Sequence, residues 1–185
     1  MPGNHASMWT IGHSNHSLAK FLEILQAHHV DALVDVRKMP RSRRNPHFNR
    51  ETLPGPLASE GIAYLHMPGL GGLRRPRRDS TNTAWRNLSF RGYADYMQTP
   101  EFQSQLDELL AVEGERVTIM CAEALPAHCH RSLIADALTA RGVAVSHILS
   151  ARRVEPHQMT SFAQVDGKRV TYPATNLTLF SAEQN

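Results

Sequence analysis

Two thiols, a carboxylate, an imidazole and a guanidinium fall within eleven consecutive positions of this chain. They belong to Cys121, Glu123, Cys129, His130 and Arg131. A cysteine is a nucleophile when its surroundings favour the thiolate, and a carboxylate beside a buried strand is a candidate general acid or base. An arginine among the free N–H groups at the start of a helix suits a phosphate or a carboxylate. The segment therefore indicates a site that combines anion binding with acid, base or nucleophilic chemistry.

Each of these side chains also has a purely structural interpretation. Cysteines at the ends of buried strands often serve as small core residues, so Cys121 need not be reactive. Arg131 would then form a salt bridge with Glu123 or Asp35, and His130 would cap the helix or pack beneath it. The sequence leaves both interpretations open.

A metal site is a third interpretation of the same segment. Cys121, Cys129 and His130, joined by His13 or His66, are ligand types that zinc and iron accept. The two cysteines are eight positions apart, unlike a compact Cys-x-x-Cys knuckle, and adjacent residues such as Cys129 and His130 rarely point the same way. We therefore predict no metal and no other cofactor, and we keep a metal or redox protein that uses Cys121 and Cys129 as an alternative.

The elements that must position these residues follow from the pattern of apolar side chains. Five short apolar runs predict strands, at 8–12, 32–36, 62–66, 117–121 and 143–149. Helical patterns lie between them, at 18–28, at 50–61 with breaks at Pro54 and Pro56, at 93–97, at 101–110 and at 131–141. This alternation predicts one α/β domain over residues 1–185, with a mainly parallel five-stranded sheet covered by helices on both faces.

The last part of the chain differs from this alternating core. Residues 151–185 form a C-terminal extension, in which Asp166 and Gly167 stand between two alternating segments. An Asp-Gly pair in that setting predicts a β-hairpin, here over residues 163–172.

Polar side chains leave the predicted strands at their carboxyl ends, whereas the amino ends begin with apolar residues. In an open parallel sheet, ligands bind beyond the carboxyl ends of the strands. The residues that leave the strands there are His13, His16, Asp35, Arg37, His66, Cys121, Glu123, Arg152 and Arg153. We therefore expect one site at this edge.

Asp35 has two interpretations that the sequence does not separate. It could orient a base or bind a ligand hydroxyl or a metal at the strand end. It could equally form an ion pair with Arg37 or Arg131 that only fixes the loop.

Basic residues are concentrated in two segments, although the net charge of the chain is only +3. Half of the 20 lysines and arginines lie at 37–50 and 73–78. Such density favours an anionic partner, either a phosphate-bearing small molecule or a nucleic acid, with Arg37, Arg41 and Arg44 as candidate anion-binding residues. Solvated basic loops without a ligand are the alternative.

The chain contains no apolar run of the roughly 20 residues that cross a membrane, and its first residues lack the pattern of a signal peptide. We therefore expect a cytoplasmic protein with reduced thiols and no membrane partner.

Four motifs together resemble the bacterial family called domain of unknown function 488. They are Thr10-Ile11-Gly12-His13-Ser14, Val34-Asp35-Val36-Arg37 with Pro40-Arg41-Ser42, Phe90-Arg91-Gly92-Tyr93, and Cys121-Ala122-Glu123 before Cys129-His130-Arg131. The resemblance covers about residues 8–150 and implies a compact α/β domain with its motifs at one edge of the sheet. It brings no settled activity, but it implies importance for the signature residues, which are His13, Asp35, Arg37, Cys121, Glu123, Cys129, His130 and Arg131.

Two pieces are also similar to rhodanese, namely 33–37 and the strand-cysteine-loop-helix unit that starts at Cys121. Rhodaneses and cysteine phosphatases carry their arginine about five residues after the cysteine. Here Cys121 and Arg131 are ten apart, with Pro126 between them. This departure argues against sulfur transfer or phosphate-ester cleavage by that same mechanism.

Our leading hypothesis is an enzyme, of hydrolase or transferase type, that acts on a phosphate-containing substrate such as a nucleotide or a nucleic acid. The candidate catalytic residues are Cys121, Glu123, Asp35 and His13, and the candidate anion-binding residues are Arg37, Arg131, His130, Arg41 and Arg44. Cys129 and His66 complete the predicted site. The alternative is a module that binds nucleic acid or a partner protein through segments 37–50 and 73–78.

Overall fold

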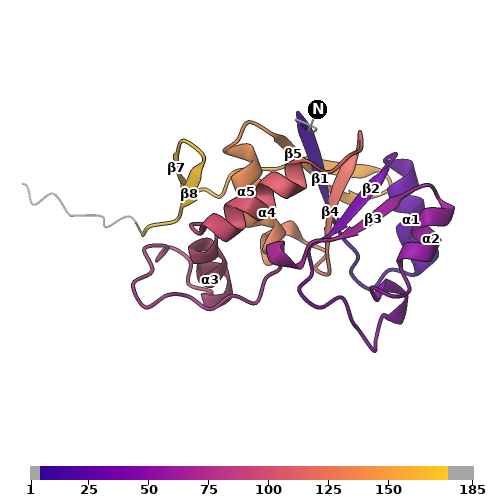
Figure 1. The fold of residues 1–185 in the computed structure, drawn as a ribbon, viewed down its shortest axis with the longest axis horizontal. Helices are drawn as coiled ribbons and strands as arrows, with labels where there is room; N and C mark the ends of the chain where they lie inside the picture. Colours follow the sequence, from indigo (N-terminus) through magenta and orange to yellow (C-terminus); the bar gives the residue numbers. More distant parts are fainter. Residues whose placement is uncertain (1–4, 175–185) are drawn as a thin grey trace, which may run out of the picture.

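The structure is a computed structural model that describes residues 5–174, and its elements are labelled in Figure 1. The strands are β1 (Ser7–Gly12), β2 (Ala32–Asp35), β3 (Ala63–His66), β4 (Val117–Cys121), β5 (Ala144–Ser150), β6 (Arg153–Pro156), β7 (Gln164–Asp166) and β8 (Arg169–Thr171). The helices are α1 (Leu18–Ala27), α2 (Pro54–Ser59), α3 (Leu88–Tyr96), α4 (Pro100–Leu110) and α5 (Arg131–Thr139).

The main sheet has the strand order β3-β2-β4-β1-β5-β6. The first five of these strands run parallel, and β6 pairs antiparallel with β5. The prediction of a mainly parallel α/β sheet with a C-terminal hairpin is confirmed, the hairpin being β7 and β8. The sheet has six strands and not the predicted five. All four residues of β6 are exposed, so this edge strand carries no apolar pattern that could have revealed it.

Helices cover both faces of the sheet, as predicted (Figure 1). Along β2, Leu33 packs into one apolar cluster, and Ala32 and Val34 pack into the other. The first cluster contains the buried faces of α1 and α2, and the second contains those of α3, α4 and α5. Successive strand side chains point to opposite faces, so a sheet buried on both sides needs apolar residues at every position.

Capping residues explain where the helices begin. The side chain of Ser17 accepts a hydrogen bond from the Lys20 amide at the start of α1, as predicted. Helix α2 begins at Pro54 and is not broken there, because proline is tolerated in a first turn, where no N–H partner is needed. Helix α3 begins five residues before the predicted Tyr93, because Asn87 caps it through the amides of Ser89 and Phe90.

The segment after β6 is anchored to α5 by one buried carboxylate. Asp136 is fully buried and accepts hydrogen bonds from Thr160, from the Tyr172 hydroxyl at 2.8 Å and from His157 at 2.8 Å. His157 in turn lies 3.0 Å from His147 of β5. A buried carboxylate is stable only when its oxygens are hydrogen-bonded, so Asp136 ties the C-terminal extension to the core.

Across residues 5–174, none of the helices has the length and apolar character needed to cross a membrane.

Gly12 marks the place where β1 passes closest to the loop after β4. A Cβ atom built on Gly12 would lie only 1.7 Å from the carbonyl oxygen of Glu123. Any side chain here would therefore displace the loop backbone. Gly55, in α2, has nothing within 4 Å of such a Cβ atom.

We predict that Gly12→Ala destabilises the protein by about 2 kcal/mol or more, because overpacking against backbone forces a shift. Gly55→Ala is the matched control and should be neutral or stabilising by up to about 1 kcal/mol, since alanine has the better helix propensity. Urea unfolding followed by circular dichroism measures both free energies. Equal stability of the two variants would contradict the close approach at Gly12.

Candidate functional site

The register of the sheet brings the predicted strand ends together. Gly12 of β1 lies beside Cys121 of β4, and Asp35 of β2 lies beside His66 of β3 and Met120 of β4. The backbone pairing continues past the strands, because the amide of His13 donates to the Cys121 carbonyl at 3.0 Å. The carboxyl ends of four strands therefore form one continuous edge, as expected for a parallel sheet.

Arg131, the first residue of α5, holds the loop that joins β4 to this helix. Its side chain is fully buried and donates to the carbonyl oxygens of Glu123 and Ala124, the latter at 2.7 Å. The guanidinium is thus committed to its own loop, and it forms no salt bridge with Glu123 or Asp35 among the described residues. The sequence suggested that Arg131 binds an anion or forms a salt bridge with Glu123 or Asp35. Its hydrogen bonds to two backbone carbonyls match neither interpretation.

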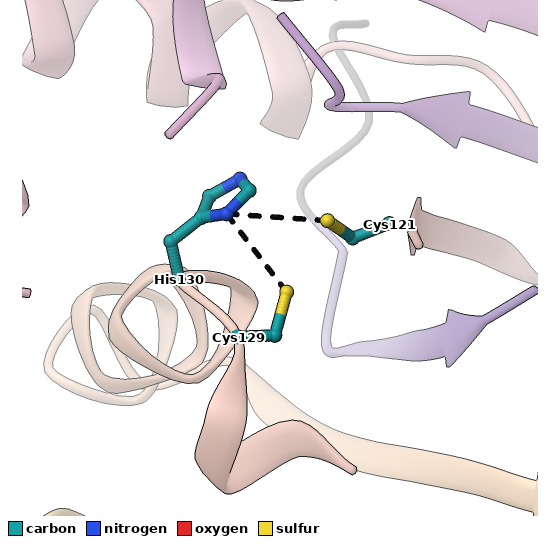
Figure 2. Close-up of side chains that lie close together, drawn as sticks. All are labelled: Cys121, Cys129 and His130. Carbon is teal, nitrogen blue, oxygen red and sulfur yellow. Dashed lines mark hydrogen bonds between the residues drawn. The ribbon is translucent and has the colours of Figure 1, made fainter. Parts of the chain in front are cut away.

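Cys121, Cys129 and His130 lie close together at the mouth of this loop (Figure 2). The Nδ1 atom of His130 is 4.0 Å from the Cys121 sulfur and 3.8 Å from the Cys129 sulfur. All three of these atoms lie within 4.8 Å of one another. The backbone is extended at Cys129 and helical at His130, and this change of conformation lets two adjacent side chains turn to the same side.

The pKa values of the two thiols are shifted in opposite directions. The hydrogen bond from Cys121 is the largest influence that lowers the pKa of the Cys129 thiol; burial opposes it, and His130 and Arg131 add to it. The same contact with Cys129, and then burial, raises the pKa of Cys121. Within the pair, these contacts favour the proton on Cys121 and the charge on Cys129.

The cluster forms part of the wall of a cavity of about 360 Å³. The lining residues are Arg37, Lys38, Met39, Gly72, Leu73, Ser89, Phe90, Cys121, Ala122, Glu123, His128, Cys129 and His130. Met39 and Leu73 are 74% and 72% exposed, which places two large apolar side chains in solvent at the rim. Such residues favour the binding of a partly apolar ligand.

A second hollow, of about 400 Å³, adjoins this cavity. The two share Arg37, Met39, Ala122 and Glu123. The second hollow is polar and basic, because His13, Asn15, Arg41 and Arg44 also line it. Three arginines face one glutamate there, so the hollow favours an anion.

A buried hydrogen-bonded chain supports the wall between the two hollows. Asp35 is fully buried, accepts from the backbone and guanidinium of Arg37 at 2.6–3.0 Å, and accepts from the Tyr64 hydroxyl at 2.8 Å. Arg37 also donates to the Phe48 carbonyl and, through Nη1, to Nε2 of His13 at 3.0 Å. Asp35 thus forms the ion pair that was one of its two predicted roles, and it positions Arg37.

A profile of the family described as "Domain of unknown function DUF488" matches residues 17–138, about two thirds of the chain. The chain belongs to the DUF488 family. The match includes every signature residue of the resemblance except His13, which lies just before it. No curated protein and no solved structure matches this DUF488 chain significantly, and the local similarity to rhodanese has no support from these comparisons.

The structure of this DUF488 protein brings five predicted residues to one cavity, namely Arg37, Cys121, Glu123, Cys129 and His130. His13, Arg41 and Arg44 lie in the adjoining hollow. His66 lies apart from the thiols, where its ring donates to the Arg37 carbonyl at 2.9 Å and contributes to a third hollow with Arg43 and Arg50.

Two lining residues, Ser89 and Leu73, carried no signal in the sequence, and Phe90 was indicated only as part of a family motif. Ser89 and Phe90 belong to α3, and Leu73 belongs to an irregular segment, so their place in the cavity depends on long-range packing. Tyr64, the partner of Asp35, precedes His66 by two positions on the same strand and so shares its face. In the sequence, only this alternation along the strand indicated that Tyr64 lies at the site.

His13 is neutral in the folded protein. Burial, and then the charge of Arg37, lowers the pKa of His13 to about 4. Its Nδ1 donates to the Ser14 carbonyl at 2.8 Å, which leaves Nε2 free to accept from Arg37. A protonated ring would lose this acceptor and face a like charge.

We predict that protonation of His13 destabilises the protein as the pH falls from about 6.5 toward about 4. In this window the unfolded chain binds the proton that the folded chain excludes, so stability is lost on acidification, by up to about 2 kcal/mol at pH 5 from this group. Urea unfolding at about pH 7.5 and about pH 5 should show a smaller loss for His13→Gln than for the wild type. The same loss in both proteins would show that His13 titrates normally.

Proposed function

We propose that this DUF488 protein is an enzyme that acts on a phosphate-bearing substrate at the carboxyl edge of its sheet. One observation carries the proposal: the cavity of the thiols and imidazole adjoins a basic hollow, and Glu123 and Arg37 line both. A substrate could therefore place an anionic group beside Arg41 and Arg44 while its reacting part lies over Cys121, Cys129 and His130.

The charge and the exposure of each side chain indicate its role in the proposed enzyme. Arg41 and Arg44 are exposed, so they can exchange water for a phosphate. Arg37 is only 8% exposed and already satisfied by Asp35, so it lends its positive charge without leaving its partners. Glu123 is exposed between the two hollows, where its carboxylate can accept a proton from a water or a hydroxyl group. A cytoplasmic location fits this proposal, since it requires reduced thiols.

Binding of nucleic acid is the second candidate, and one observation favours it. Arg41, Arg43 and Arg50 line a further hollow of about 520 Å³ and extend the basic surface beyond the proposed site. In the segment 73–78, Arg75 and Arg78 are exposed, whereas Arg74 and Arg77 already have partners within the chain. Arg74 stacks on Tyr96 at 3.5 Å and donates to the carbonyls of Gly69 and Gly71, and Arg77 pairs with Asp79 at 2.8 Å.

We predict that the double variant Arg41→Ala, Arg44→Ala binds adenosine 5′-monophosphate and inorganic phosphate about tenfold more weakly than the wild type, because charge-assisted hydrogen bonds to phosphate are lost. Arg86→Ala, Arg152→Ala removes the same charge from exposed positions outside both hollows and is the control. Isothermal titration calorimetry measures the affinities. Equal weakening in both double variants would argue against a phosphate site. Tight binding of a single-stranded oligonucleotide that falls steeply with salt would favour the binding module.

We predict that Glu123→Gln lowers kcat by about 100-fold or more, as expected for loss of a general acid or base. The matched control is Glu115→Gln, an exposed glutamate just before β4 at the opposite edge of the sheet. Turnover is measured on substrates found by screening nucleoside mono-, di- and triphosphates and bis-p-nitrophenyl phosphate. Failure to turn over any phosphate ester, or full activity of Glu123→Gln, would contradict the proposal.

A further inference from the structure

The cluster of Cys121, Cys129 and His130 contains the donor set that zinc prefers, and the structure arranges it with one side open. We propose that these three residues bind a zinc ion, through both sulfur atoms and Nδ1 of His130, and leave a fourth position free toward the cavity. The inference rests on the proposed function only for what the ion would do, because the site itself stands on the geometry of the three donors.

The distances between the donors are close to those of a tetrahedral site. With Zn–S bonds of about 2.3 Å and Zn–N bonds of about 2.0 Å, a tetrahedron separates sulfur from nitrogen by about 3.5 Å and the two sulfurs by about 3.8 Å. The observed sulfur-to-nitrogen distances are 3.8 and 4.0 Å, and all donor atoms lie within 4.8 Å of one another. Shifts below about 1 Å would therefore complete three corners of the coordination shell.

The donors stand on elements that hold them in place. Cys121 is the last residue of β4, and its carbonyl accepts from the His13 amide of the neighbouring chain segment. The Cys129 carbonyl accepts from the amide and from the hydroxyl of Ser132 in α5. Arg131 fixes the intervening loop from inside. Sites on such supports need little reorganisation when they bind their ion.

His130 presents its ring to the sulfurs because its surroundings leave it little freedom. The ring lies 5.0 Å from that of Tyr93, and a Cβ atom on Gly72 would approach Nδ1 to 3.0 Å. Nε2 is buried and has no hydrogen-bond partner among the described residues. With Nδ1 bound to an ion, the ring proton resides on Nε2, and the ring needs no change of orientation to act as a ligand.

The fourth position determines what kind of zinc site this is. Structural sites use four protein ligands, whereas catalytic sites use three and keep one position for water or substrate. The cluster opens into the cavity that Glu123 and His128 also line, and both of those residues are exposed. A water on the ion would lie within the same cavity as Glu123, which could accept its proton, and the ion would lower the pKa of that water. This arrangement deepens the proposed function by naming the source of its nucleophile.

The test is metal analysis of the full chain, expressed without a histidine tag and purified without chelator. We expect about one zinc per chain by elemental analysis. After removal of the metal, titration with Co²⁺ should give the thiolate-to-cobalt charge-transfer band and the intense visible bands of a tetrahedral site, and zinc should displace them. Absence of stoichiometric metal together with absence of these bands would overturn the proposal, as would a Cys121–Cys129 disulfide in protein purified under reducing conditions.

Variants identify the ligands. Cys121→Ser, Cys129→Ser and His130→Ala should each weaken zinc affinity by about 100-fold or more. His16→Ala, which removes a histidine outside the cavity, is the control and should bind as the wild type does. His128→Ala should also bind normally if the fourth position is open. Circular dichroism confirms folding, and protection of both thiols from a thiol reagent by zinc in the wild type gives a readout that needs no variant. Wild-type affinity in all three ligand variants would overturn the assignment.

The same measurements separate this inference from the proposed function. Zinc bound by Cys121, Cys129 and His130 without any phosphate binding or turnover would support the metal site and contradict the proposed function. Turnover of a phosphate ester by protein that neither contains nor binds zinc would support the proposed function and overturn the metal site.

Discussion

The guanidinium of Arg131 is buried where no water reaches it, and its hydrogen bonds to the carbonyl oxygens of Glu123 and Ala124 determine the path of the loop after β4. Gly12 lies against the same loop, with no room for a side chain. These two contacts hold the turn between Cys121 and α5. Because the turn is held, Cys121 at the end of a strand and Cys129 and His130 at the start of a helix meet. The cavity, the basic hollow beside it and the proposed metal site all depend on this local constraint.

Charged residues at this edge divide into two groups by burial. Asp35 and Arg37 satisfy each other inside the protein, with Tyr64 and His13 as further partners. Such residues cost too much to expose or unpair, so they set the shape and the electrostatic potential of the edge. Arg41, Arg44 and Glu123 are exposed and can exchange their water for a ligand. The buried group therefore positions the surface on which the exposed group can act.

Much of the fold was predictable because a parallel sheet buried on both faces has a simple sequence pattern. The five apolar runs and the Asp166-Gly167 turn correspond to strands and to a hairpin turn in the structure. The failures have specific causes. Strand β6 is exposed along its whole length, so no run of buried apolar residues signals it, and the start of α3 depends on one asparagine cap within an irregular stretch.

The sequence by itself determined which residue types reach the carboxyl edge, because strand ends follow from local apolar periodicity. It could not determine which of those residues face one another. Cys129 and His130 were expected to diverge, and only a change of backbone conformation between them turns both toward Cys121. Asp35 had two roles open, and the structure places it in the ion pair with Arg37. Arg131 also had two roles open, but its buried contacts with the Glu123 and Ala124 carbonyls match neither of them. The physical reason is that contacts between residues far apart in the chain set the direction of each side chain, while periodicity sets only the element on which it stands.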